Sequence, residues 1–472
     1  MKKRTLVLML ISFALLTMNA GAQQVPGGKD LTGAWMGKIN PGAISMRVIF
    51  NLSYAEGDSL VATLDSPDQG VKGIKLGPVT LDENRIKISA GALLAEYNGI
   101  IKNDTLIEGK FTQAGATLDL NLTRLIDEFS LNRPQEPVPP FPYRSEETEF
   151  ENKQAGITLA ATLTLPEGQG PFPAVILITG SGAQNRDEEL MGHKPFLVIA
   201  DYLTKKGIAV LRYDDRGTGK SQGNYSSATS ADLATDAAAA LDFLKTRTEI
   251  DPSAIGLAGH SEGGLIAPIL ASSRKDVAFI VSLAGPGVKG EDIIHRQNSD
   301  ISLAMGLSPA DIKESIAVNR KLYSVLRKEP DNARAEEKIR QTYSKILDRQ
   351  KVTGAEKEEA MKQLAAGFNP VIFTWYRYFI SLDPAKYWEK TSCPVLALNG
   401  EKDLQVSAEL NLPAIEKALI SGGNSKVTTI SLPGLNHLFQ NSETGLPTEY
   451  GEIEETFSPE VLRIIADWIL DL

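Results

Sequence analysis

Short runs of alternating apolar and polar residues fill the first part of the chain, from about residue 31 to residue 124. The runs and the turn-forming clusters between them include residues 46–50, 86–88, 117–122, 82–84 and 102–104. A period of two is typical of strands that bury one face, and the closely spaced turns favour antiparallel pairing. The pattern predicts an all-β domain, a small barrel or sandwich, over residues 23–130.

The pattern changes after a proline-rich segment, residues 131–145, which is typical of an extended, semi-rigid linker. Uninterrupted apolar runs then alternate with helix-compatible segments as far as residue 472. The apolar runs are residues 175–178, 208–211, 255–258, 279–283 and 395–398. This alternation predicts a mostly parallel, doubly wound sheet over residues 146–472. Residues 288–387, approximately, are charged and helically spaced, and we expect them to form an inserted helical cap.

The sequence Gly-His-Ser-Glu-Gly at residues 259–263 follows one of these apolar runs and precedes a helix-compatible segment. A serine in such a strand-to-helix turn is held exposed on a strained backbone, and the glycines avoid clashes in the tight bend. The motif alone is weakly specific, but its context favours an α/β-hydrolase fold with Ser261 as nucleophile.

A serine nucleophile needs a histidine base, and the histidine needs a carboxylate that fixes its tautomer. In this fold the order along the chain is serine, acid, histidine. His437 is the expected base, because His295, the other histidine after Ser261, falls in the predicted cap. The loop after residues 395–398 offers two acids, of which Asp403 is preferred to Glu401.

The oxyanion formed during attack requires two backbone N–H donors, one from the residue after the nucleophile and one from a loop after an early strand. We therefore expect the amides of Glu262 and Ser181, with Gly182 as the alternative to Ser181. Residues 213–221 resemble a phosphate loop but lack its spacing, so Arg216 and its neighbouring aspartates are expected to brace a turn. No metal is expected, because no His, Cys or carboxylate cluster has metal-ligand spacing, and an acyl-enzyme mechanism requires no cofactor.

Composition and charge narrow the possible partners and the cellular location. The basic start, apolar run and small-residue exit of residues 1–22 predict a secretory signal cleaved after Ala22, and hence a periplasmic or extracellular protein without stable membrane insertion. The formal net charge of −10 disfavours nucleic acid as a partner. The single cysteine, Cys393, cannot form an internal disulfide.

These motifs together resemble a bacterial family of exported α/β-hydrolases, described as serine aminopeptidase-like or carboxylesterase-like, along nearly the whole mature chain. The residues that carry the resemblance are 33–37, 64–70, 107–113, 180–188, 213–221, 259–264, 399–405 and 436–437. The resemblance is more specific for family than for substrate, because the fold hosts many acyl-transfer activities.

The first hypothesis for function is a serine carboxylic ester hydrolase that acts on a small-molecule ester through an acyl-enzyme on Ser261. A cap above the nucleophile would favour short acyl groups, and the aromatic segment 368–380 either lines the acyl pocket or packs in the core of the cap. The alternatives are a serine aminopeptidase or related peptidase and a scaffold-type glycan-binding protein. The oligomeric state does not follow from the sequence.

Overall fold

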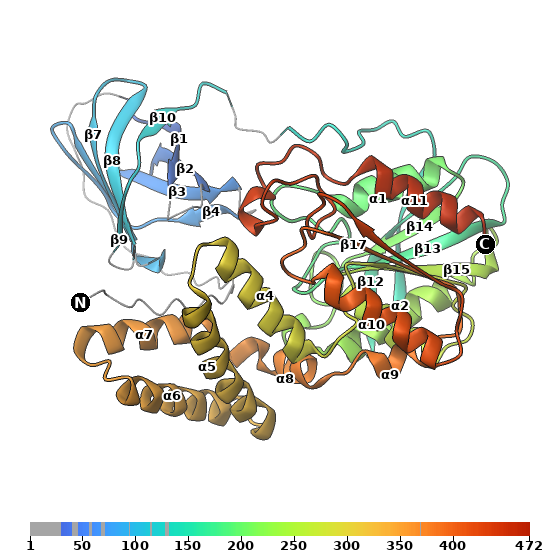
Figure 1. Cartoon of the computed structure of the whole chain (residues 1–472). Coiled ribbons are helices and arrows are strands. Elements are labelled where there is room, and N and C mark those ends of the chain that lie inside the picture. The colour runs from blue at the N-terminus through green and yellow to red at the C-terminus, as the bar shows by residue number, and fades with distance from the viewer. Residues whose placement is uncertain are drawn as a thin grey trace.

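The computed structural model describes most of the chain and contains two separate β-sheets (Figure 1). The described residues are 30–39, 46–55, 59–67, 71–93, 95–113, 116–127, 132–368 and 370–472. The predicted signal segment, residues 1–22, lies outside them. No helix within the described ranges combines the length and the apolar character needed to cross a bilayer.

The first sheet is antiparallel throughout and occupies the amino-terminal region. Its strands are β1 (Gly33–Ile39), β2 (Met46–Tyr54), β3 (Leu60–Ser66), β4 (Val71–Lys75), β5 (Val79–Asp82), β6 (Arg85–Ala90), β7 (Ala95–Ile101), β8 (Leu106–Gln113), β9 (Ala116–Asp119) and β10 (Leu122–Arg124), with a 3₁₀ turn η2 (Gly91–Leu93) between β6 and β7. They are ordered β4-β3-β2-β1-β10-β8-β7-β6-β5, with β9 paired to β8. Alternate side chains point inward, so that Trp35, Phe50 and Tyr97 form the centre of one core.

The second sheet has eight strands in the order β11-β12-β14-β13-β15-β16-β17-β18. They are β11 (Arg144–Asn152), β12 (Ile157–Leu165), β13 (Phe172–Ile178), β14 (Ala209–Tyr213), β15 (Ile250–His260), β16 (Ile280–Leu283), β17 (Val395–Gly400) and β18 (Val427–Leu432). From β14 to β18 all pairs are parallel, whereas β11 and β12 pair antiparallel. This topology, with the reversal at β14 and β13, is that of the α/β-hydrolase fold, as the sequence predicted.

Helices cover both faces of this sheet and leave its central strands buried. Helices α1 (Pro195–Lys205) and α11 (Pro459–Leu470) pack on the face that carries Val175 and Leu177. Helices α2 (Ser230–Leu244), α3 (Gly263–Ala271) and α10 (Ala408–Ser421) pack on the opposite face. The strands therefore read as continuous apolar runs, because neither face meets water.

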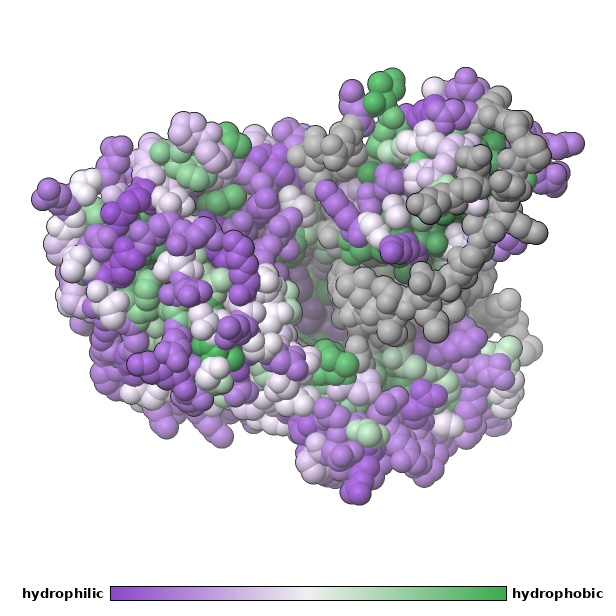
Figure 2. Space-filling model, turned by 180° about the vertical axis from the view of Figure 1, so that it is seen from behind, coloured by the Kyte–Doolittle hydropathy of each residue, from purple (hydrophilic) through white to green (hydrophobic). Residues whose placement is uncertain are grey.

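The chain between β16 and β17 forms a separate helical layer with its own apolar core. It comprises α4 (Gly290–Ala304), α5 (Pro309–Lys328), α6 (Asn332–Arg349), α7 (Gly354–Gly367), the 3₁₀ turn η4 (Pro370–Ile372), α8 (Phe373–Ser381) and α9 (Ala385–Trp388). Leu265 of α3 and Val406 of the loop after β17 belong to the same core, so this layer packs on the hydrolase body. We call it the cap. In the view from behind, the surface is hollowed between the hydrolase body and the amino-terminal sheet (Figure 2).

The antiparallel strands β11 and β12 are absent from the sequence-based prediction, and β11 begins at Arg144, inside the segment expected to be linker. The omission of β11 has a physical reason. Strand β11 lies at the edge of the sheet and carries four glutamates, with Phe150 its main apolar contribution to the core. An edge strand of this composition resembles a solvated loop in sequence, although its nine residues pair in register with β12.

Candidate active site

Ser261 lies at the turn between β15 and α3, where the backbone is forced into a left-handed conformation with φ of 50°. The turn is tight enough to exclude side chains on both sides. A Cβ on Gly259 would lie 2.1 Å from the carbonyl of Gly263, and a Cβ on Gly263 would lie 2.1 Å from the carbonyl oxygen of Ile178. The Ser261 amide donates to the carbonyl of Leu283 on β16 at 2.8 Å, which fixes the turn to the sheet. The serine is held partly exposed above the carboxyl ends of the strands.

Asp403 and His437 meet beside this turn, although they come from two different loops. His437 Nδ1 lies 2.7 Å from Asp403 Oδ2, and both side chains are buried. The other carboxylate oxygen of Asp403 accepts the amides of Gln405 at 2.8 Å and Val406 at 2.9 Å. Glu401, the alternative acid, is exposed to solvent. The contacts therefore place Asp403, and not Glu401, where it can orient the histidine.

The loop after β13 faces the same turn, and most of its polar groups already have partners. The Gly180 amide donates to Glu188 Oε1 at 2.7 Å, and the Gly182 amide donates to the Tyr225 hydroxyl at 2.9 Å. Within the described ranges, the backbone amides of Ser181 and Glu262 donate to no protein acceptor. Glu262 also stands at the amino-terminal end of α3, where the helix dipole favours negative charge. The amide of Gly182, the alternative oxyanion donor, already donates to the Tyr225 hydroxyl.

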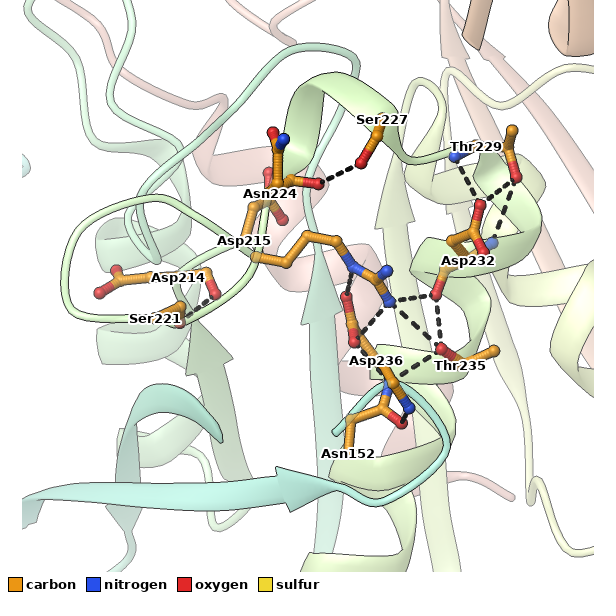
Figure 3. A network of polar contacts seen from close by, with 12 residues as sticks. Asn152, Asp214, Asp215, Ser221, Asn224, Ser227, Thr229, Asp232, Thr235 and Asp236 are labelled. Carbon is orange, nitrogen blue, oxygen red and sulfur yellow. Dashed lines mark hydrogen bonds and ion pairs between the residues drawn. The ribbon is translucent and has the colours of Figure 1, made fainter. Parts of the chain in front are cut away.

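The segment expected to brace a turn, residues 213–221, holds the loop after β13 in place through hydrogen bonds. Asp215 accepts the Thr179 hydroxyl at 2.8 Å and the Gln184 amide at 2.9 Å, so it binds both ends of the loop. Burial raises the pKa of Asp215 well above its ordinary value, although both hydrogen bonds oppose the change. The Arg216 guanidinium pairs with Asp236 at 2.7 Å and 2.9 Å (Figure 3). These contacts hold the turn after β14, which is the role expected for this segment.

A second histidine, His260, directly precedes the nucleophile in the chain and contacts the loop of His437. The sequence alone did not indicate a role for it. Its Nδ1 lies 2.9 Å from Glu188 Oε1 and its Nε2 lies 3.0 Å from the carbonyl of His437. The rings of His260 and His437 contact each other with centroids 4.8 Å apart. Burial lowers the pKa of His260, but the charge and hydrogen bond of Glu188 outweigh it, so the pKa is raised. In the sequence, the signal that could have indicated this contact is Glu188, an acidic residue eight positions after Gly180.

The carboxyl group of Glu262 connects the nucleophile turn to the cap. Its Oε1 accepts the Ser230 hydroxyl at 2.5 Å and the Trp375 indole N–H, from helix α8, at 2.7 Å. Burial raises the pKa of Glu262, despite hydrogen bonds that favour the charged form. Other aromatic residues of segment 368–380 do not face the nucleophile turn, because Phe373, Tyr376 and Phe379 lie in the core of the cap. Only part of this segment therefore faces the nucleophile turn.

His295 stays in the cap, as expected from its position in the sequence. It stacks on Tyr323 with ring centroids 5.5 Å apart, and its Nε2 lies 3.4 Å from Glu291. Both contacts belong to helices α4 and α5. The histidine that meets Asp403 is His437.

The fold and this arrangement of serine, histidine and aspartate define a hydrolase of the α/β-hydrolase class. Residues 155–412 match the family described as X-Pro dipeptidyl-peptidase (S15 family). This match covers more than half of the chain, and the chain therefore belongs to that family.

Two curated relatives and several solved structures are similar to the chain. Esterase EstD of Thermotoga maritima is 29% identical over 324 residues, which are 66% of this chain and 67% of the relative. Putative hydrolase YtaP of Bacillus subtilis is 29% identical over 173 residues, 32% of this chain and 58% of the relative. The structure of Est1E from Butyrivibrio proteoclasticus is 17% identical, with 69% and 98% coverage and a TM-score of 0.41. Hypothetical protein PA2218 from Pseudomonas aeruginosa is 17% identical, with 74% and 99% coverage and a TM-score of 0.45.

Proposed function

We propose that the protein hydrolyses carboxylic esters through an acyl-enzyme on Ser261, with His437 as base, Asp403 as its partner, and the amides of Ser181 and Glu262 as oxyanion donors. The single observation that carries this proposal is the 2.7 Å contact of His437 with Asp403 beside the strained turn of Ser261. The name of the relative esterase EstD supports an ester as substrate. The protein is a hydrolase that acts on esters.

The proposed reaction has two steps. The Ser261 hydroxyl attacks the acyl carbon while His437 Nε2 takes its proton, and the same proton then passes to the leaving alcohol. Water, deprotonated by His437, then attacks the acyl carbon, and His437 returns the proton to the Ser261 oxygen as the acyl–serine bond breaks and the acid leaves. Asp403 holds the Nδ1–H of the histidine throughout, so that Nε2 faces the serine. The two amides stabilise the negative oxygen that develops in each step.

A peptidase remains the second candidate, because the family is named for an X-Pro dipeptidyl-peptidase. A peptidase of this kind has to hold the amino terminus of its substrate, and Glu262 is the acidic group next to the nucleophile. This carboxyl is buried and already accepts Ser230 and Trp375 through one oxygen. These contacts favour a role within the protein, so we place the ester before the peptide. A glycan-binding scaffold without catalysis ranks below both.

The test compares the wild-type protein with Ser261→Ala on nitrophenyl esters, X-Pro nitroanilides and aminoacyl amides. We expect ester hydrolysis and labelling by a fluorophosphonate probe in the wild type, and a loss of several orders of magnitude in the variant. Ser253→Ala is the matched control, because Ser253 is exposed on the other end of the same strand, β15. Unchanged ester turnover in Ser261→Ala would overturn the assignment, and activity on X-Pro amides alone would move the function to the peptidase.

We further propose that the protein is exported to the periplasm or beyond, with its signal cleaved after Ala22. The support is the three-part composition of residues 1–22. Mass spectrometry of protein from fractionated cells should give an amino terminus at Gln23. Full-length protein confined to the cytoplasm would contradict export.

A further inference from the structure

The loop that carries His437 is long and has little regular structure. It runs from the end of β18 at Leu432 to the start of α11 at Pro459, with one 3₁₀ turn, η5 (Pro447–Glu449). A connection of this length needs bracing contacts if it is to hold a histidine in one position. We call residues 433–458 the base loop.

The inner part of the base loop is braced by its own side chains. Asn436 accepts the amides of Leu438 at 2.9 Å and Gln440 at 3.0 Å, and its Nδ2 donates to Gln440 Oε1 at 2.9 Å. Gln440 in turn donates to the carbonyl of Glu455 at 2.9 Å. The position of His437 therefore depends on the returning segment of the loop around residues 450–457.

Tyr450 links this returning segment to the acid loop. Its hydroxyl accepts a hydrogen bond from Gln405 at 3.2 Å, two residues beyond Asp403, and its buried side chain also hydrogen-bonds the backbone of His437. Its carbonyl faces His193 Nε2 at 2.8 Å. A shift of Tyr450 would thus disturb the loops of Asp403 and His437 together.

The residues directly after Tyr450 are bound from outside the hydrolase sheet, by the segment that joins the two sheets. The Arg133 guanidinium donates to the carbonyls of Gly451 at 2.8 Å and Ile453 at 2.9 Å, and its Nε donates to the carbonyl of Gly192 at 3.0 Å. Arg47 of β2, in the amino-terminal sheet, also donates to the carbonyl of Gly451 at 3.0 Å. In Figure 1 the carboxyl-terminal segment before α11 reaches towards β4 of this sheet.

Gln135, two residues after Arg133 in the connecting segment, makes a second attachment to the base loop. Its Oε1 accepts the amides of Thr456 at 2.6 Å and Phe457 at 3.1 Å, and its Nε2 donates to the carbonyl of Phe457 at 2.7 Å. Such paired contacts reproduce the hydrogen bonds of a neighbouring strand. They hold the backbone without regard to the side chains of the loop.

We propose that Arg133 and Gln135, together with Arg47 of the amino-terminal sheet, form a clamp that positions the base loop, and thereby His437, for catalysis. The proposal rests on the proposed function of His437. It gives the amino-terminal domain and its connecting segment a role in the reaction, through the placement of the base. Arg133 suits this role because its planar fork can serve several carbonyls at once, which the single ammonium of lysine cannot.

The test measures kcat and KM for nitrophenyl acetate in the full-length protein and in Arg133→Ala, Arg133→Lys and Gln135→Ala. We expect kcat to fall about 10- to 100-fold in Arg133→Ala and Gln135→Ala with KM changed less than about threefold, because a displaced base slows the chemical step. In Arg133→Lys, the logarithm of kcat should regain less than half of what it loses in Arg133→Ala. Full recovery by lysine would show that only the charge matters and would overturn the clamp.

Arg124→Ala is the matched control. Arg124 also donates to backbone carbonyls, those of Asp30 and Thr32, but within the amino-terminal sheet. Its loss should lower the stability of that domain and leave kcat unchanged. A fall in kcat equal to that of Arg133→Ala would show a general effect of domain stability and would overturn the clamp.

Hydrogen exchange gives an independent readout that also serves if Arg133→Ala folds poorly. In Gln135→Ala the amides of Thr456 and Phe457 should exchange at least tenfold faster, while amides of β13 and β15 keep their protection. Unchanged kcat in variants whose exchange is faster would overturn the clamp and leave the ester hydrolase intact. Absence of Ser261-dependent ester hydrolysis in the wild type would instead overturn the proposed function.

Discussion

The most informative perturbation of the active site is Glu188→Gln, because Glu188 determines the charge of His260. Both ring nitrogens of His260 face groups that accept hydrogen bonds, the Glu188 carboxylate and the carbonyl of His437. A neutral imidazole can donate from only one nitrogen, so two acceptors favour the doubly protonated cation. Glu188 Oε1 also accepts the Gly180 amide at 2.7 Å. Glutamine preserves the shape and an accepting oxygen but removes the negative charge.

The magnitude follows from the loss of a charge-assisted contact. Hydrogen bonds to charged groups contribute about 1.5–3 kcal/mol and those between neutral groups about 0.5–1.5 kcal/mol, so the substitution should lower the free energy of unfolding by about 1–2 kcal/mol. Because the pKa of His260 is raised in the folded protein, this contribution is complete below the unfolded value of about 6.5. It is lost as the pH rises through the folded pKa. The cost of Glu188→Gln should therefore be largest near pH 6 and should shrink towards pH 9.

The assay is the difference in Tm between wild type and Glu188→Gln at pH 6 and at pH 9. A cost of this size corresponds to about 1.5–3 °C at pH 6, because a domain of about 330 residues unfolds with an entropy of roughly 0.7 kcal/mol/K. Glu189→Gln is the control, since Glu189 is the exposed neighbour and its substitution should change little at either pH. A difference that is constant with pH, or larger at pH 9, would show that His260 is neutral and refute the reasoning.

Three further predictions concern the acid, the turn and the cap. Asp403→Asn should reduce kcat about 10⁴-fold, because the amide favours the wrong histidine tautomer, whereas Glu401→Gln should keep most activity, and a pH-stat assay on an activated ester distinguishes them. Gly263→Ala should abolish activity and cost at least about 1–3 kcal/mol of stability, because its Cβ would lie 2.1 Å from the Ile178 carbonyl oxygen, whereas Gly91→Ala, with no atom within 4 Å of the new Cβ, should be tolerated in both assays. Across nitrophenyl esters from acetyl to palmitoyl, kcat/KM should peak at short chains, and Trp375→Ala should shift the peak to longer ones; a flat profile in the wild type would contradict a cap above the pocket.

The sequence was sufficient for the parallel strands of the hydrolase sheet, because buried parallel strands are apolar on both faces. Strand β17 and the predicted apolar run at residues 395–398 begin at the same residue. The edge strand β11 was missed because its polar face dominates its composition. A local apolar pattern indicates which side chains are buried. An edge strand such as β11 buries too few side chains to be distinguished from a loop.

The candidate site shows the same division between local and distant information. The motif around Ser261 and the order of acid and histidine depend on short segments, and these could be read from the chain. The contacts of Glu188 with His260, 72 residues apart, and of Arg133 with Gly451, 318 residues apart, depend on the folded arrangement. Acidic and basic residues at such positions look like ordinary surface charges in sequence, since only burial distinguishes them.

Three side chains surround the loop after β13 and determine which of its amides can meet a substrate. Glu188 takes the amide of Gly180, Tyr225 takes that of Gly182, and Asp215 takes the Thr179 hydroxyl. Burying carboxyl groups beside a nucleophile is unfavourable, as the raised pKa of Asp215 reflects. The loop is thereby fixed before substrate arrives, so that the proposed oxyanion donors would need no rearrangement when negative charge develops. The stability lost at this edge of the sheet fixes the loop whose Ser181 amide we propose as an oxyanion donor.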